Sequence, residues 1–500
     1  MSHWFYRKKQ RFVLLTVAVL VFSFLVGHTP SPAFGNTPGN GTDAKHYTEL
    51  QFPPLPEINL PDYTRYQLDN GMTVFLMEDR ELPLVSGTAL FRTGERFEPA
   101  DKVGLADITG EVMRTGGTTK HTADQLNEIL EQKAASVETG ISTDAGSASF
   151  SALTEDVSEV FELFAEVVRM PVFAADKVDL AKKQRQGGIA RRNDDPNDIA
   201  SREFAKLIYG KNSPYSRTAE YATLANVSRE DLVSFHRQYF HPNNMILGIV
   251  GDFDSASMRK LIAEKFGDWP VDESFKVPPL PTVSQANNSG IFFVDQPQLT
   301  QSSVLLGQLG GQLNSPDYPA LTVLNDLLNG FGGRLFNEVR SRQGLAYSVY
   351  GVWSPRYDYP GMFIAGGQTR SEATVPFIQG IFNEIKRLRT EMVSPEELAF
   401  AKESTLNSFI FNFAEPVRTL SRLMRYEYYG YPNDFIFQYR RGVEATTAED
   451  VLRVAQTYLK PETMVTLVVG NSSQIQPALS SLGSGKKVNL IDITIPEPQS

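Results

Sequence analysis

Residues 239–251 read YFHPNNMILGIVG, and residues 458–470 read YLKPETMVTLVVG. The two stretches share Tyr, Pro, Met and Gly at a constant offset of 219 residues. Both end in an apolar run rich in β-branched residues, which is typical of a buried strand. A repeat of this kind predicts that the chain contains two homologous units.

The duplication extends towards the N-terminus. Pro196 and Tyr209 in the first unit correspond to Pro416 and Tyr429 in the second, at an offset of 220 residues. A single-residue loop insertion accounts for the change of offset. The two units therefore correspond over long helical stretches as well as over one strand.

Each unit mixes strands and helices. An Asn-Gly turn at residues 70–71 precedes the apolar run 72–76, which has the pattern of a strand. Thr122 and Gln125 have the spacing of a capping box at the start of a helix that reaches about residue 133. The alternation predicts the α+β class, with an antiparallel sheet packed with helices in each unit.

We expect an N-terminal domain at residues 56–269 and a C-terminal domain at residues 290–480. The proline-rich segment 270–289 between them has the composition of an extended linker. Residues 481–500 are polar and are expected to form a loosely held tail.

The first 33 residues have the features of a secretory signal. Basic residues precede an apolar run at residues 12–27, and Ser31-Pro32-Ala33 provides a small-x-small cleavage site. We therefore expect cleavage after Ala33, a flexible lead at residues 34–55, and an exported protein in the periplasm or another extracytoplasmic space. An uncleaved leader would instead anchor the protein in a membrane.

Composition excludes several classes of protein. There are 58 acidic and 48 basic residues, a net charge of -10, and no long basic run, so no nucleic-acid partner is expected. Hydrophobic residues make up 41% of the chain, as in ordinary globular proteins. The absence of cysteine excludes disulfides, thiolate nucleophiles and cysteine-based zinc sites.

Short motifs occur in a fixed order along the chain: QLDNGMTV at 67–74, GLADITGE at 104–111, GGT at 116–118, YFHPNNM at 239–245 and RSRQGLAY at 340–347. On these motifs nearly the whole mature chain resembles the pitrilysin/insulinase family of zinc metallopeptidases. The resemblance implies two α+β domains that form a clamshell chamber around a peptide.

The zinc site of that family is an H-x-x-E-H helix, with two histidine ligands on one face and a glutamate as general base. Here Asp107 and Glu111 stand at the histidine positions and Gly110 stands at the general-base position. The stretch 186–189, where a further glutamate ligand is expected, contains none. The resemblance therefore implies a degenerate site with no metal and no cofactor of its own.

Other residues offer no clear replacement for this site. Asp107 and Glu111 are spaced i, i+4, but two carboxylates alone make a poor calcium or magnesium site, so a solvated acidic face is favoured. The histidines outside the leader, which have no His-x-x-x-His spacing, are expected to be surface or capping residues: His46, His121, His236 and His241.

Arg340 and Tyr347 match a second feature of the family. In its active members, an arginine and a tyrosine seven residues apart in the second domain approach the zinc site and steady the substrate carbonyl. The resemblance implies that Arg340 and Tyr347 form such a pair and act in trans, at a zinc site on another chain.

The function implied by this resemblance is that of a non-catalytic subunit of a two-chain zinc peptidase. A homologous partner subunit would carry the zinc, and this chain would bind peptide substrate. Two alternatives stay open: an active metallopeptidase with an unrecognised metal site, and a catalytically inert structural or assembly protein. Metal analysis tests the first, and the second predicts that Arg340 and Tyr347 can be changed without consequence.

Overall fold

The computed structural model describes residues 58–483 and 487–497. The chain from Asn59 onwards forms one compact unit. The predicted signal at residues 1–33 and the lead at residues 34–55 lie outside the described residues. Among the residues described, no helix is both long enough and apolar enough to cross a membrane.

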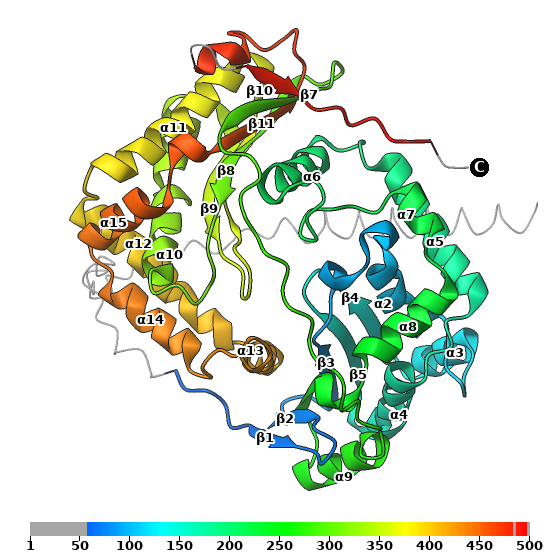
Figure 1. The fold of residues 1–500 in the computed structure, drawn as a ribbon. Coiled ribbons are helices and arrows are strands. Elements are labelled where there is room, and N and C mark those ends of the chain that lie inside the picture. Colours follow the sequence, from blue (N-terminus) through cyan, green and yellow to red (C-terminus); the bar gives the residue numbers. More distant parts are fainter. Residues whose placement is uncertain (1–57, 484–486, 498–500) are drawn as a thin grey trace, which may run out of the picture. The chain divides into compact units, whose positions relative to one another are not determined.

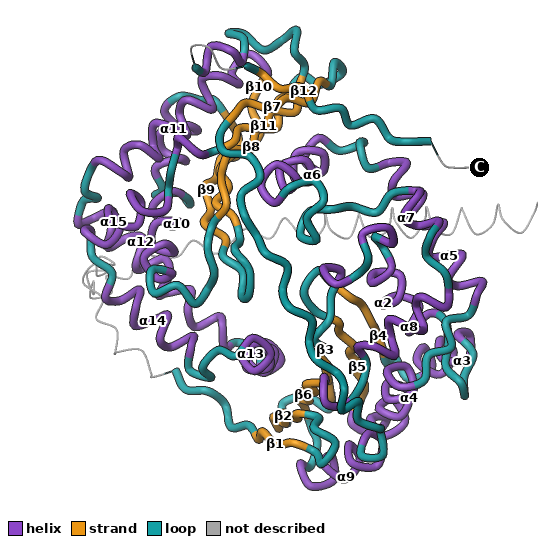
Figure 2. Tube along the Cα trace, viewed as in Figure 1, coloured by secondary structure: helices purple, strands orange, loops and turns teal. Residues whose placement is uncertain are grey.

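The first half of this unit contains a six-stranded sheet in the order β1-β2-β6-β3-β5-β4 (Figures 1 and 2). Its strands are β1 (Thr64–Gln67), β2 (Thr73–Glu78), β3 (Leu84–Phe91), β4 (Ser136–Ile141), β5 (Gly146–Leu153) and β6 (Met245–Gly251). The helices are α2 (Leu105–Thr115), α3 (Ala123–Gln132), α4 (Val157–Arg169), α5 (Ala175–Arg191), α6 (Pro196–Tyr209), α7 (Tyr221–Ala225), α8 (Arg229–Tyr239) and α9 (Ser255–Phe266).

The second half contains a six-stranded sheet in the order β12-β7-β11-β8-β10-β9 (Figure 2). Its strands are β7 (Gly290–Asp295), β8 (Gln301–Leu309), β9 (Ala346–Ser354), β10 (Met362–Arg370), β11 (Val465–Gly470) and β12 (Val488–Leu490). The helices are α10 (Tyr318–Leu328), the π-helix η6 (Phe336–Arg342), α11 (Thr374–Thr390), α12 (Pro395–Ser408), α13 (Pro416–Tyr429), α14 (Phe435–Ala445) and α15 (Ala448–Tyr458).

The predicted duplication and the α+β class are confirmed. β6 and β11, the strands of the repeated motif, take the same place in their sheets, and each follows an equivalent helix, α8 or α15. The predicted capping box at Thr122 and Gln125 is also present. Both sheets are mainly antiparallel, but the pairs β2–β6 and β7–β11 run parallel, which the long helical connections between their strands permit.

The two sheets differ in their outermost strand. β1 precedes β2 in the chain and runs antiparallel to it, whereas β12 comes from the C-terminal end and runs parallel to β7. β12 lies within residues 481–500, which were expected to be loosely held. That expectation is wrong for residues 488–490, because they cover the edge of β7 that would otherwise leave its backbone groups unpaired.

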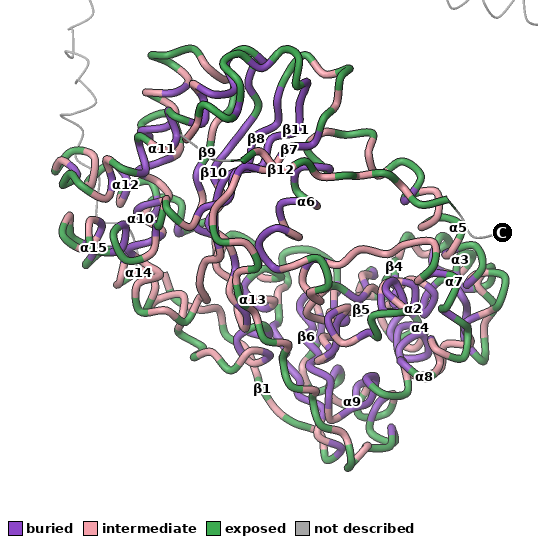
Figure 3. The backbone as a smooth tube through the Cα atoms, turned by 45° about the horizontal axis from the view of Figure 1, so that its top comes forward, coloured by how far each residue is buried: buried purple, intermediate pink, exposed green. Residues whose placement is uncertain are grey.

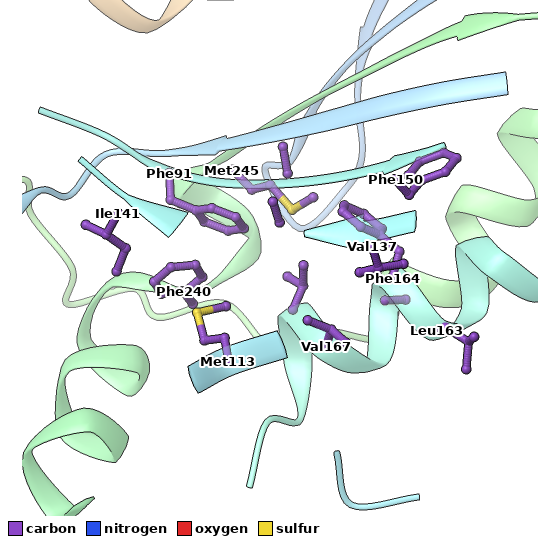
Figure 4. Close-up of a cluster of buried hydrophobic side chains, with 14 of the residues drawn as sticks. Phe91, Met113, Val137, Ile141, Phe150, Leu163, Phe164, Val167, Phe240 and Met245 are labelled. Carbon is purple, nitrogen blue, oxygen red and sulfur yellow. The ribbon is translucent and has the colours of Figure 1, made fainter. Parts of the chain in front are cut away.

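The core of the first half lies between its sheet and its helices. Figure 4 shows part of it, including Phe91 of β3 and Phe240 after α8, whose ring centroids are 4.4 Å apart. Met113 of α2 belongs to the same buried cluster, so burial of this helix face fixes the rotation of α2. In the second sheet, burial falls from the central strand to the edge strand. Figure 3 shows that β11 is buried and that the edge strand β9 is partly exposed.

Two equivalent helices join the halves reciprocally. α6 of the first half packs on the second sheet, in a buried cluster that includes Phe204 and Leu305. α13 of the second half packs on the first sheet, in a cluster that includes Phe75 and Leu423. Because α6 and α13 correspond in the repeat, each half contributes the same element to the core of the other.

Candidate functional site

Helix α2 carries Asp107, Gly110 and Glu111, the residues predicted to stand at the positions of the zinc motif. Glu98 caps its start, since the backbone N–H groups of Gly104 and Ala106 donate to the Glu98 carboxylate at 3.1 and 2.9 Å. Burial raises the pKa of Glu98 to about 7, although these N–H groups oppose the shift. This buried cap and the apolar face of the helix hold Asp107 and Glu111 in fixed directions.

Arg185 of α5 joins the two carboxylates. Its Nε donates to Asp107 Oδ2 at 2.8 Å, and its Nη1 donates to the Glu111 carboxylate. Burial acts to lower the pKa of Arg185, but the two carboxylates outweigh it and the pKa is raised. The predicted acidic face is partly exposed to solvent, but its charge is not free, because a helix distant in sequence supplies a counter-charge to both acids.

Gly110 lies directly against β4. Its carbonyl accepts a hydrogen bond from Thr139 Oγ1 at 2.5 Å. A Cβ atom at this position would lie 2.4 Å from the backbone nitrogen of Ile141 and 2.7 Å from the carbonyl carbon of Gly140. Position 110, which is predicted to correspond to the general base, therefore has no room for any side chain while β4 stays in place.

The residues of α2 do not fit a catalytic zinc ion. Such an ion takes three protein ligands, usually with histidine among them, and an open position for water. Asp107 and Glu111 instead neutralise a guanidinium, and the position of the base is glycine. Throughout the part of the chain that the structure describes, no three His, Cys, Asp or Glu residues gather closely enough to hold a metal ion.

Replacing Arg185 by glutamine is expected to lower the free energy of unfolding by about 1 kcal/mol, because Asp107 and Glu111 then repel each other without a counter-ion. The side chain of Asp107 is 46% exposed, so salt screens this repulsion and the loss should shrink at high ionic strength. Urea titrations at low and high salt measure it. Lys183→Gln on the exposed side of α5 is the control, and an equal loss in both variants would contradict the pairing.

The histidines are held by partners of their own. His121 Nδ1 lies 2.8 Å from Glu166 Oε2, and His241 Nδ1 lies 2.7 Å from Asn243 Oδ1. His236 Nε2 donates to the carbonyl of Val168, and burial lowers the pKa of His236 to about 4. The prediction of surface or capping histidines is wrong for His241, which is buried. His46 lies outside the described residues.

Arg340 and Tyr347 lie together on the second half. Arg340 comes from η6 and Tyr347 from β9, the edge strand. The guanidinium carbon of Arg340 is 4.8 Å from the ring centroid of Tyr347 and 4.6 Å from that of Phe336. Tyr347 is 84% exposed. Stacking between two rings orients the guanidinium, and no carboxylate among the described residues pairs with it.

A cavity of about 310 Å³ adjoins this pair. Tyr347 and Ser348 of β9 and Gln368 and Arg370 of β10 line part of its wall. Tyr347 therefore belongs to the wall of this hollow, and Arg340 lies next to it through its contact with the Tyr347 ring.

Models of one protein family match both halves of the chain. The model described as Insulinase (Peptidase family M16) matches residues 75–218, and the model described as Peptidase M16 inactive domain matches residues 226–405. The chain belongs to peptidase family M16. Helix α2, with Asp107, Gly110 and Glu111, lies within the residues that the insulinase model matches.

The relatives of this M16 chain are distant in sequence. An uncharacterized zinc protease of Rickettsia felis is 24% identical over 340 residues, which is 67% of this chain and 80% of the relative. The structure of a peptidase M16 inactive domain from Pseudomonas fluorescens has a TM-score of 0.75 and 24% identity, over 83% of this chain and all of that chain. A protease from Helicobacter pylori has a TM-score of 0.72 and 20% identity, over 82% of this chain and all of that chain. These likenesses show a common fold.

Arg185 is the residue of the M16 site that sequence reasoning missed. It immediately precedes residues 186–189, where the further glutamate ligand was sought. Two carboxylates one helical turn apart signal a need for a cation, but the sequence does not indicate which arginine supplies it.

Proposed function

We propose that this M16 chain is the non-catalytic subunit of a two-chain zinc peptidase. One observation carries the proposal: a guanidinium takes the place of the metal between Asp107 and Glu111, while Arg340 and Tyr347 stay stacked, accessible and without a counter-ion among the described residues. In this proposal the chain has no metal site of its own on α2, and Arg340 and Tyr347 would serve a metal site on the partner.

The partner in this proposal is a homologous chain with an intact H-x-x-E-H helix. Its zinc would supply the activated water and polarise the peptide carbonyl. Arg340 of this chain would donate N–H groups, and Tyr347 its phenolic O–H, to the carbonyl oxygen as negative charge develops there. The hollow beside β9 and β10 would hold the neighbouring part of the peptide.

The proposal also includes a location outside the cytoplasm, on the strength of the leader at residues 1–33. A membrane-anchored form would place the same site at a membrane surface without changing its chemistry.

The isolated chain is expected to bind no stoichiometric zinc and to cleave no peptide, and cleavage should start when the zinc-bearing homologue is added. Elemental analysis and a fluorogenic peptide assay on separate and mixed proteins measure both. A partner whose general-base glutamate is replaced by glutamine is the control, since it should form the pair without restoring cleavage. One zinc per chain together with cleavage by the isolated protein would support the active-metallopeptidase alternative. A partner that is fully active alone would support the assembly alternative.

A further inference from the structure

A second cavity, of about 350 Å³, lies beside the turn between β4 and β5. Its wall includes Ser142 and Asp144 of that turn, Arg356 and Tyr357 of the turn between β9 and β10, and Arg425 and Tyr429 of α13. The cavity is distinct from the one beside Tyr347, with which it shares none of these residues.

The charges around this cavity favour an anion. Arg356 and Arg425 are both exposed, and neither forms an ion pair with any residue that the structure describes. Asp144 is the one acidic residue in the cavity wall. Asp358, next to Tyr357, is already paired with the buried Arg96 at 2.9 Å. The cavity is therefore cationic, although the chain as a whole has a net charge of -10.

Asp144 is held in the wall by its own hydrogen bonds. Tyr429 Oη donates to Asp144 Oδ2 at 2.6 Å, and Ser142 Oγ donates to Asp144 Oδ1 at 3.1 Å. Burial, and then the charge of Asp144, raise the pKa of Tyr429, so its hydroxyl keeps its proton. Tyr429 and Ser142 are thus the hydrogen-bond donors to Asp144, and among the described residues neither Arg356 nor Arg425 pairs with its carboxylate.

The aromatic part of the wall is rigid. The rings of Tyr357 and Tyr429 stack with centroids 4.5 Å apart and planes 3° apart, and Tyr431 Oη donates to the carbonyl of Tyr357 at 2.7 Å. Leu90 and Pro355 add apolar surface. A cavity of this volume with mixed walls fits an amino-acid residue better than a bare ion.

We propose that this cavity binds a carboxylate of a peptide, held between Arg356 and Arg425. The planar guanidinium matches a carboxylate with two parallel hydrogen bonds, and the tyrosines enclose the rest of the residue. The inference rests on the proposed function, in which this chain binds peptide, and it names the group that is recognised. A free C-terminus and an acidic side chain offer the same chemistry.

Fluorescence anisotropy of the isolated full chain with three labelled peptides of otherwise identical sequence tests the inference. One peptide has a free C-terminal carboxylate, one has a C-terminal amide, and one has the amide and a single glutamate in place of glutamine. At least one carboxylate peptide should bind about tenfold more tightly than the amide, and added salt should weaken that binding. The peptide that binds more tightly identifies the source of the carboxylate. Equal binding of all three would overturn the inference.

Arg356→Ala and Arg425→Ala are each expected to weaken the binding of that peptide about tenfold. Arg418→Ala is the matched control for Arg425→Ala, because Arg418 lies on α13 as Arg425 does, pairs with Glu415 and is absent from the cavity wall. Asp144→Asn should strengthen binding a few-fold, because it removes the one negative charge of the wall. Equal weakening by Arg418→Ala and Arg425→Ala, or weaker binding by Asp144→Asn, would overturn the inference. These measurements need neither zinc nor a partner, so failure here is distinguishable from failure of cleavage in the mixed proteins.

Discussion

Gly110→Glu, which restores the general-base residue of M16 peptidases, is expected to lower the free energy of unfolding by about 3 kcal/mol or more. The Cβ atom alone would lie 2.4 Å from a backbone atom of β4, and backbone atoms of a paired strand cannot move aside as a side chain does. The variant should unfold at a lower temperature in calorimetry. Amide hydrogens in β4 should also exchange faster, since this strand must shift to admit the new side chain.

Gly188→Ala is the control for this experiment. Gly188 also lies within a helix, α5, but a Cβ atom there would meet nothing within 4 Å. Because alanine favours the helix over glycine, this variant should be more stable by up to about 1 kcal/mol. If Gly110→Glu were as stable as the unchanged chain, β4 would be movable and the closed base position would not be a fixed property of the fold.

The crowding at Gly110 also affects any attempt to introduce a zinc site on α2. The triple substitution Asp107→His, Gly110→Glu and Glu111→His creates the H-x-x-E-H sequence but leaves Arg185 next to two histidines. It also leaves β4 against the position of the base. An intact H-x-x-E-H sequence on α2 would therefore still lack the space and the free ligands that a zinc site needs.

Much of the fold is predictable from the sequence because it depends on local patterns. The apolar run at 245–250 and its copy 219 residues later identify β6 and β11 and predict the duplication. The capping box at Thr122 places the start of α3 correctly, because its hydrogen bonds lie within one turn. The resemblance to the family singles out Asp107, Gly110 and Glu111, and the structure places all three on α2.

The features that were missed depend on contacts between distant segments. The ion pairs of Arg185 join residues more than 70 positions apart. The packing of α6 on the second sheet and of α13 on the first sheet joins the two halves. β12 was missed because a three-residue strand in a polar stretch has no periodic signal, and it is held by pairing with β7. The cationic cavity likewise contains Asp144 and Arg356 from two different turns and Arg425 from helix α13.

Arg340→Ala is expected to lower the peptidase activity of the reconstituted pair about a hundredfold, with the partner still bound. Removal of one preorganised donor to a developing oxyanion typically has an effect of this size. Arg340→Lys should recover only part of the activity, because an ammonium keeps the charge but loses the planar stacking between Phe336 and Tyr347. Tyr347→Phe should have a smaller effect, since it removes one hydroxyl donor and keeps the ring.

Separate measurement of kcat and KM distinguishes a catalytic role of Arg340 from a structural one. A group that acts on the developing oxyanion lowers kcat and kcat/KM together, whereas a group that only binds peptide raises KM. Arg342→Ala is the matched control, because Arg342 lies on the same π-helix, is 70% exposed and pairs with Glu338. Size-exclusion chromatography should find every variant still paired with the partner. Full activity of both Arg340→Ala and Tyr347→Phe in an intact pair would contradict catalysis in trans by these residues and favour the inert assembly protein.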